Sequence, residues 1–236
     1  MEKISDKRIV ILAFLFIVAI VAYILTMKSH TVELIETTSE NDTTRIHVQI
    51  PKIMNTTNTD FENDFNSHIQ QIVSGIIQDV KASAQEAFKK GFLRTKYEVD
   101  IVTKLKYTSK NFVSLVMYYY TYTGGAHGNT LVSTYNIDLK RGKVLSLDDI
   151  FDNACNYKDI IRKEIVNQIN LQKDNYFEDA VEYVQKDTLS QRPFTITKDA
   201  LQIYYQDYEI APHSTGMPIF EIPFSKLETC LRYKFH

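Results

Sequence analysis

The sequence has little of what several common classes of protein need. Its charged side chains nearly cancel, with 27 Lys and Arg against 29 Asp and Glu, so the basic excess of a nucleic-acid-binding protein is missing. It has only two cysteines, Cys155 and Cys230, and no Cys-x-x-Cys motif or Cys/His cluster that would indicate structural zinc. Outside the cytoplasm two cysteines can form a disulfide. We expect two idle thiols instead, because a chain of this length can build a sizeable core without a crosslink.

The usual signatures of catalysis and metal binding are also missing. His47, His127 and His213 have no second ligand at a spacing that would present both to one metal ion, so we predict no metal site and no cofactor. No Gly-x-Ser-x-Gly motif is present, and the TGGAHG segment lacks the Lys-Ser/Thr pair and the following helix of a phosphate loop. We therefore predict that the protein is not an enzyme and has no catalytic residue.

The group Asp148, Asp149 and Asp152 is the best alternative to that prediction. A fold that brought His127 close to Asp148 would create a candidate enzyme site. The simpler interpretation is structural, because these carboxylates lie at a predicted helix start, where negative charge complements the helix dipole.

The N-terminal region contains one long hydrophobic run. Residues 9–27, IVILAFLFIVAIVAYILTM, carry no charge and are long enough to cross a bilayer as a helix. Basic residues precede the run, which places the short N-terminus in the cytoplasm and the body outside, in a single-pass protein of the cell membrane. A cleaved signal peptide is the alternative, but it would have a shorter apolar region and a small-residue cleavage site.

The chain is predicted to have an α+β fold. Residues 1–27 form a cytoplasmic tail and the transmembrane anchor, and two α+β lobes with antiparallel sheets and packed helices follow. In the first lobe, residues 28–142, two strands precede a helix that begins in a Thr59/Glu62 capping box and ends at Gly91. Alternating segments at 96–107, 112–123 and 130–138 then predict three long strands.

The second lobe, residues 143–236, is predicted to begin with helices. Ser146 caps a short turn, Asn156 precedes a helix through residue 170, and Asn175 precedes another through Lys186. Strands at 194–197 and 201–206, an extended piece at 218–224 and a short C-terminal helix complete it.

Two stretches are candidate binding segments. In YYYTYTGGAHGNTLVSTYNID, residues 118–138, the glycines, including Gly128, allow positive φ where the chain reverses between two strands. The alternating tyrosines form either an ordinary half-buried strand face or a recognition surface beside an exposed loop. In YEIAPHSTGMPIFEIP, residues 208–223, prolines fix a rigid path that serves either as scaffold or as binding rim. The predicted binding residues are Tyr118, Tyr120, Tyr122, Gly124, Gly125, His127, Tyr208, Pro212 and His213.

Taken together, these two stretches resemble the extracytoplasmic module shared by peptidoglycan deacetylases of the PdaC type and lysozyme-sensing anti-sigma factors of the RsiV type. The resemblance extends over residues 31–230 and implies a two-part α+β fold. The deacetylases carry their metal-dependent chemistry in a separate C-terminal domain, and the anti-sigma factors hold their sigma factor through a cytoplasmic segment. We expect this chain to have the shared module alone, and His213 stands where many relatives have tyrosine.

These observations predict a membrane-anchored, non-catalytic binding module of the cell envelope. Its expected partner is a wall-acting protein such as lysozyme, or the peptidoglycan glycan itself, with the membrane contacted through residues 9–27 and no nucleic acid bound. The alternative is an enzyme or accessory domain that acts on cell-wall glycan, with a site near His127 and Asp148. Signalling through the membrane helix is a third possibility, which the near absence of polar residues inside that helix disfavours.

Overall fold

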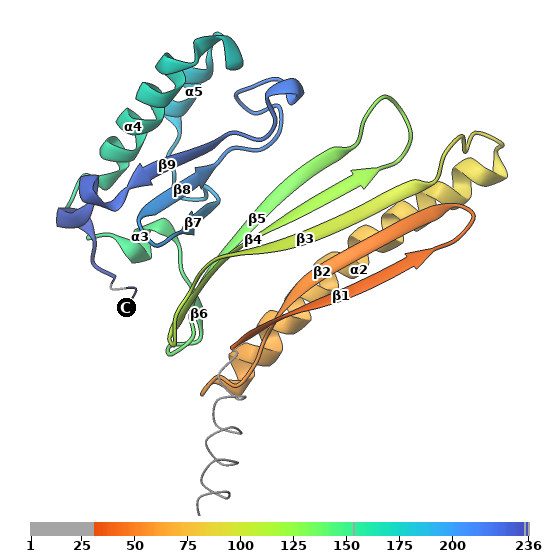
Figure 1. Cartoon of the computed structure of the whole chain (residues 1–236), viewed down its shortest axis with the longest axis horizontal. Helices are drawn as coiled ribbons and strands as arrows, with labels where there is room; N and C mark the ends of the chain where they lie inside the picture. Colours follow the sequence, from red (N-terminus) through yellow and green to blue (C-terminus); the bar gives the residue numbers. More distant parts are fainter. Residues whose placement is uncertain (1–30, 153, 234, 236) are drawn as a thin grey trace, which may run out of the picture.

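The computed structural model describes residues 31–152, 154–233 and 235 of the chain. The predicted anchor at residues 9–27 lies outside them. Within these residues, no helix combines the length and the apolar character that a membrane crossing requires. The described chain folds into two β-sheets, each packed with helices, which confirms the predicted α+β class (Figure 1).

The first sheet has six strands in sequence order. They are β1 (Val32–Glu40), β2 (Thr44–Ile53), β3 (Tyr97–Thr108), β4 (Phe112–Tyr122), β5 (Asn129–Asp138) and β6 (Lys143–Val144). Neighbouring strands pair antiparallel except β2 and β3, which are parallel. The exception follows from the connection, because α2 (Thr59–Lys89) carries the chain from the end of β2 back to the start of β3.

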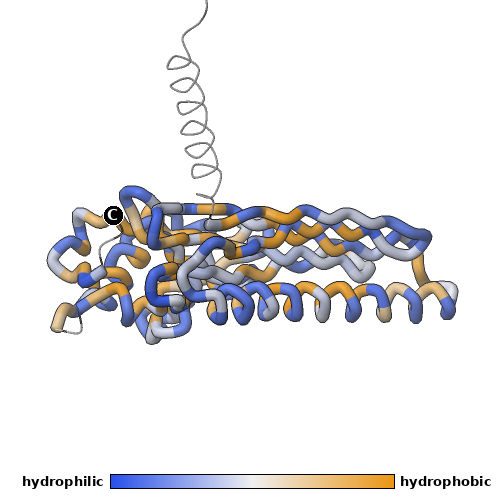
Figure 2. Tube along the Cα trace, turned by 90° about the horizontal axis from the view of Figure 1, so that it is seen from below, coloured by the Kyte–Doolittle hydropathy of each residue, from blue (hydrophilic) through white to orange (hydrophobic). Residues whose placement is uncertain are grey.

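Helix α2 lies along one face of this sheet, and hydrophobic and polar positions alternate along it (Figure 2). Its buried side chains are Phe65, Ile69, Val73, Val80 and Ala84. The predicted capping box at Thr59 is wrong. Asn58 caps the helix by accepting a hydrogen bond from the Phe61 amide at 3.0 Å, while Glu62 accepts one from the Thr56 amide. Gly91 ends the helix as predicted, with φ of 67° just after the C-cap residue Lys90.

The second sheet has three antiparallel strands, β7 (Phe194–Ile196), β8 (Ala200–Tyr204) and β9 (Ile219–Pro223). Helices α3 (Leu147–Ile150), α4 (Tyr157–Leu171) and α5 (Ala180–Lys186) accompany it, with 3₁₀ turns η1 (Lys173–Asn175), η2 (His213–Thr215), η3 (Phe224–Lys226) and η4 (Glu228–Cys230). The predicted starts at Ser146 and Asn156 are confirmed. The predicted helix start after Asn175 is wrong, because the Phe177 amide bonds to the Ile210 carbonyl oxygen and helix α5 begins only at Ala180.

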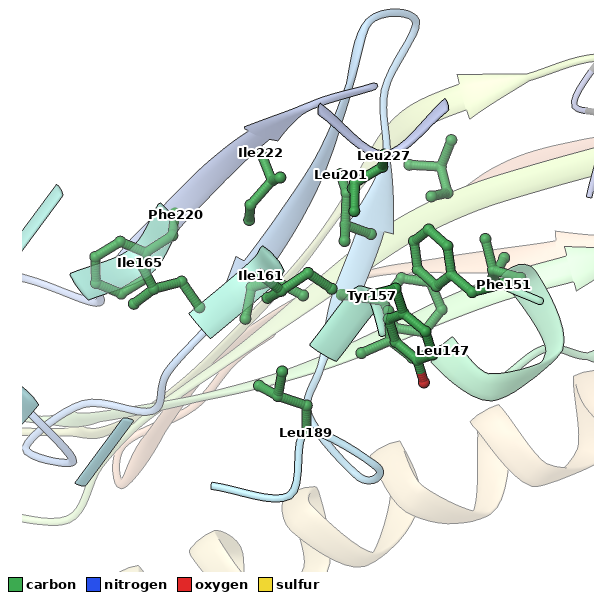
Figure 3. Packing of buried hydrophobic residues seen from close by; sticks show 14 of the residues in the cluster. Leu147, Phe151, Tyr157, Ile161, Ile165, Leu189, Leu201, Phe220, Ile222 and Leu227 are labelled. Atoms are coloured by element: carbon green, nitrogen blue, oxygen red, sulfur yellow. The ribbon is translucent and has the colours of Figure 1, made fainter. Parts of the chain in front are cut away.

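The core of this lobe forms between α4 and the second sheet. Tyr157, Ile161, Ile165 and Ile169 recur every four residues on α4 and are buried. They pack with Phe220 and Ile222 of β9 and Leu201 of β8, and with side chains from the α3 region such as Leu147 and Phe151 (Figure 3). Because they are spaced four residues apart, these four side chains lie on one face of α4.

The two cysteines form a disulfide, so the expectation of idle thiols is wrong. Cys230 lies in η4, beside an isolated bridge between Phe151 and Leu231. The Asp152 amide also donates to the Cys230 carbonyl oxygen at 2.8 Å. These contacts fold the C-terminal segment back onto the end of α3 and bring Cys230 to a Cα–Cα distance of 5.3 Å from Cys155.

A polar joint connects the two sheets. Ser114 of β4 and Asn136 of β5 are fully buried, and the Ser114 hydroxyl donates to the Asn136 side-chain oxygen at 2.7 Å. The Asn136 amide donates to the Phe194 carbonyl oxygen at 2.7 Å, and the Ile196 amide donates to the Ser114 hydroxyl oxygen at 2.8 Å. Because hydrogen bonds require specific distances and angles, these contacts fix how β7 lies against the first sheet.

Candidate functional site

The hairpin between β4 and β5 reverses through glycines, as predicted for two of the three. Gly124 and Gly125 have φ of 92° and 106°, and the Tyr122 hydroxyl donates to the Gly125 carbonyl oxygen at 3.0 Å. The prediction is wrong for Gly128, whose φ is not positive. A Cβ atom at Gly128 would lie 2.3 Å from the Tyr120 ring, so any other residue here would have to displace that ring.

The three alternating tyrosines have different surroundings. Tyr118 packs beside a small buried cluster that includes Tyr204 of β8, and burial raises the pKa of Tyr118. It therefore contributes to the packing between the sheets. Tyr120 and Tyr122 line an open hollow of about 490 Å³ near the hairpin, together with Arg45. All three tyrosines are half-buried, and Tyr120 and Tyr122 are the two that border this hollow.

The loop between β8 and β9 approaches this hairpin and is attached to the edge of β5. The Gln206 side chain makes two hydrogen bonds to Val132 of β5, accepting from its amide and donating to its carbonyl oxygen, both at 2.9 Å. Pro212 has φ of −69° and leads into η2, which begins at His213. The side-chain amide of Gln206 thus substitutes for a neighbouring strand and holds the loop beside the hairpin.

Three rings from the two segments meet in what we call the aromatic cluster, made of His127, Tyr208 and His213. The His213 ring stacks on His127 with centroids 4.6 Å apart and on Tyr208 with centroids 5.6 Å apart. The Tyr208 hydroxyl lies 3.4 Å from Nε2 of His127. His127 and Tyr208 are exposed, the latter by 50%. The structure therefore brings together three of the predicted binding residues, one from the first stretch and two from the second.

Tyr208 has a backbone conformation that few side chains adopt, with φ of 62°. Such left-handed residues cost about 1–3 kcal/mol outside glycine and cluster at functional sites. In this conformation the exposed Tyr208 ring lies against His213 in the aromatic cluster.

Asp207 lies beneath the aromatic cluster, and the sequence analysis did not select it. Its side chain is 6% exposed, and its Oδ2 lies 2.5 Å from Nδ1 of His213. Its Oδ1 is buried and is the single buried side-chain polar atom without a hydrogen-bond partner in the described part of the chain. A buried carboxylate oxygen in that state is a strong acceptor, and it lies in the loop that carries the exposed rings. Its only sequence signal is its position next to Tyr208.

The alternative pair, His127 and Asp148, is not brought together. Asp148 belongs to α3, which lies at the opposite end of the second sheet from the β8–β9 loop (Figure 1). There Asp148 accepts a hydrogen bond from the Tyr157 hydroxyl and pairs with Lys158 at 3.0 Å. Both contacts lower the pKa of Asp148, and the hydrogen bond from Tyr157 has the larger effect. Asp149 completes the capping box of α3. No group of three His, Cys, Asp or Glu residues suited to a metal ion occurs in residues 31–152, 154–233 and 235.

Two family models match the chain side by side. The model described as "Deacetylase PdaC" matches residues 37–130, and the model described as "Protein of unknown function (DUF3298)" matches residues 148–225. The first match contains β4 and the turn that leads into β5, and the second contains the β8–β9 loop. The aromatic cluster is therefore built from both matched regions.

Comparisons with individual proteins agree with these matches. The chain is 28% identical over 142 residues to the peptidoglycan-N-acetylmuramic acid deacetylase PdaC of Bacillus subtilis, covering 58% of this chain and 30% of that protein. It therefore spans less than a third of the length of this curated relative.

Two solved structures share its fold. A DUF3298 family member from Bacteroides fragilis has a TM-score of 0.62 and 21% identity, covering 86% of this chain and 93% of that chain. Another from Pseudomonas aeruginosa has a TM-score of 0.56 and 19% identity, covering 85% and 94%. Residues 37–130 are therefore similar to the PdaC family model, and residues 148–225 are similar to the DUF3298 family model.

Proposed function

We propose that this protein is a non-catalytic binding module of the cell envelope, held at the outer face of the membrane by residues 9–27. The observation that carries the proposal is the aromatic cluster, in which two loops from separately matched regions place exposed rings on one surface. Rigid aromatic side chains beside glycine-rich loops are typical of recognition surfaces, because they offer large contact area at little cost in conformational entropy. The relative PdaC is named for an activity on peptidoglycan, which supports an envelope role here.

The leading partner is a wall-acting protein such as a lysozyme-like hydrolase. Tyr208 supports this choice. Its ring is half-exposed, its backbone has an uncommon positive φ, and its loop is attached to β5, so the ring is already held in one orientation before a protein partner binds. The hollow at Tyr120 and Tyr122 extends the same end of the molecule with further aromatic surface.

The peptidoglycan glycan is a second candidate, favoured by the unpaired oxygen of Asp207. Sugar hydroxyls donate hydrogen bonds to buried carboxylates, and aromatic rings pack on sugar faces. If the loop rearranged so that a sugar hydroxyl reached Oδ1 of Asp207, the hydroxyl would supply the missing hydrogen bond while the aromatic rings packed on the sugar.

The deciding experiment measures binding of the full chain, in detergent, to hen egg lysozyme and to soluble peptidoglycan fragments. The variant Tyr208→Asn removes the ring but tolerates positive φ, so we expect it to change the free energy of unfolding by less than about 0.5 kcal/mol. It should weaken binding at least about tenfold, the loss expected for an aromatic anchor at the centre of an interface. Phe88→Asn is the matched control, because Phe88 is a similarly exposed aromatic, 57%, on α2.

Saturable binding of lysozyme that Tyr208→Asn weakens and Phe88→Asn does not would support the leading partner. The same pattern with fragments alone would support the glycan. If neither ligand binds, or if both variants bind as the native chain does, the aromatic cluster is not the recognition surface.

A further inference from the structure

A second cavity opens at the other end of the first sheet. It has a volume of about 780 Å³ and lies where the β3–β4 turn, the β5–β6 hairpin and the C-terminal segment after η4 meet. Its volume falls within the range of about 300–1,000 Å³ that is usual for small-molecule sites. We call it the basic pocket. Because β4 runs between the two ends of the sheet, the pocket is separate from the aromatic cluster.

The lining of the basic pocket has an excess of positive charge. Its four cations outnumber its two carboxylates and leave a net charge of +2; the six residues are Lys140, Arg141, Lys143, Arg232, Asp138 and Asp149. Arg141 pairs with Asp138 at 2.8 Å, and Lys143 pairs with Asp149 at 2.5 Å. Lys140 and Arg232 form no ion pair with any described residue, so their charges are available to a ligand.

Asp138 stays ionised and therefore neutralises one cation only. Burial acts to raise its pKa, but hydrogen bonds from the Arg141 amide, the Tyr233 hydroxyl and the Arg141 guanidinium outweigh burial and hold the pKa below its ordinary value. The Asp138 carboxylate is thus paired with Arg141, and it leaves Lys140 and Arg232 without an ion-pair partner.

The other wall of the pocket is aromatic. The Phe112 ring lies 5.5 Å from the Tyr233 ring and 5.0 Å from the Phe235 ring, measured between centroids. Phe112 is 1% exposed and supports the half-buried Tyr233 ring, which faces the pocket. Cations on one side and ring carbon on the other suit a ligand with an anionic group and an apolar or ring-shaped body.

The C-terminal wall is held in place by several contacts. The Arg232 and Tyr233 amides both donate to the Ile150 carbonyl oxygen, at 3.0 and 3.1 Å, and the Tyr107 hydroxyl donates to the Phe235 carbonyl oxygen at 2.8 Å. The disulfide at Cys230 fixes the chain just before this wall. The pocket therefore has a preformed shape, which lowers the entropic cost of binding.

We propose that the basic pocket binds a small anion, a carboxylate or a phosphate, carried on a sugar ring or a body of similar size. Lys140 and Arg232 form charge-assisted hydrogen bonds to the anionic group, and the half-buried Tyr233 ring packs against the body of the ligand. A planar guanidinium recognises both carboxylate and phosphate through paired N–H donors. This site is independent of the aromatic cluster, so the proposed function can fail while this proposal holds.

The test is calorimetric titration of the full chain in a nonionic detergent with three probes. N-acetylmuramic acid and N-acetylglucosamine share a sugar ring and differ in the carboxylate-bearing lactyl group, and inorganic phosphate supplies the anion alone. We expect N-acetylmuramic acid to bind and N-acetylglucosamine not to bind. Phosphate binding that excludes the sugar acid would identify a phosphate-bearing ligand for the same pocket. Equal binding of the two sugars, or no binding of either anion, would overturn the proposal.

Variants then place the site. Lys140→Gln and Arg232→Gln each remove an exposed, unpaired charge, so we expect the fold to be retained and anion binding to weaken at least about tenfold, as for a lost hydrogen bond to a charged group. Lys198→Gln is the matched control, an exposed lysine in the β7–β8 turn outside the pocket. If Lys198→Gln weakens binding as much as the pocket variants do, the anion binds by general charge and the proposal is wrong.

Discussion

The disulfide between Cys155 and Cys230 should contribute a large share of the stability of the second lobe. The two cysteines are 75 residues apart. Closing a loop of that length removes chain entropy from the unfolded state equivalent to about 4.5 kcal/mol at 25 °C. The double variant Cys155→Ala/Cys230→Ala should therefore lose about 4 kcal/mol of unfolding free energy. For a protein of this size that corresponds to a fall in Tm of about 8–16 °C.

Urea and thermal unfolding, followed by far-UV circular dichroism and tyrosine fluorescence, measure this loss, since the chain has 15 tyrosines and no tryptophan. A reducing agent supplies the control, because it should lower the stability of the native chain and leave the double variant unchanged. Mass spectrometry after alkylation reports whether the folded protein has free thiols. Two alkylated cysteines in the native protein, or equal stability with and without reductant, would refute the reasoning.

The disulfide also has a local consequence. It fixes the chain just before Arg232 and Tyr233, so reduction should loosen the C-terminal wall of the basic pocket. We expect the double cysteine variant to bind the anionic probe more weakly under conditions where it is still folded. Lysozyme or glycan binding at the aromatic cluster should change less, because that surface lies at the other end of the second sheet (Figure 1).

Three further predictions test other parts of the structure. Gly125→Ala should lower the free energy of unfolding by about 1–3 kcal/mol, because φ of 106° suits only glycine. His127→Ala should change the free energy of unfolding, measured by thermal melts, by less than about 0.5 kcal/mol. Hydrogen bonds, first with Asp100, raise the pKa of His47 above 6.5, so its contribution to stability is complete below pH 6.5 and disappears as the pH rises through the raised pKa. His47→Gln should therefore lower Tm more at about pH 5.5 than at about pH 8.5, and an equal loss at both would contradict this. Arg192→Met removes the cation that pairs with the partly buried carboxylates of Asp187 and Glu209 and should lower the free energy of unfolding in urea by about 3 kcal/mol, with Arg192→Lys losing less.

Local patterns predicted most of the secondary structure. The long strands of the first sheet and helices α2 and α4 follow from periodicity and from capping or terminating residues such as Asn156 and Gly91. The errors arose where tertiary contacts decide. The segment after Asn175 has a good helix start, but the bond between Phe177 and Ile210 overrides it. Gly128 needs no positive φ, and only the Tyr120 ring beside it explains the glycine.

The candidate site could be predicted in its parts but not in its arrangement. His127 and His213 each stood out in an unusual local sequence, but they are 86 positions apart, and no periodicity in the sequence predicts that their segments meet. Asp207 has no local signature, because its importance comes from burial and from an oxygen without a partner. The disulfide could not be predicted for the same reason, because it forms only when the segment that carries Cys230 folds back onto α3.

The polar joint explains how the aromatic cluster keeps its geometry. Apolar packing alone tolerates sliding between two sheets, because dispersion contacts have little directionality. Buried Ser114 and Asn136 remove that freedom, since any shift of β7 would leave their polar groups unsatisfied at a cost of about 1–3 kcal/mol each. The joint and the Gln206 contacts to β5 therefore hold the β8–β9 loop at one position relative to the hairpin. A recognition surface made from two loops needs that constraint, because the stacking of His127 on His213 exists only while the two lobes keep this relative position.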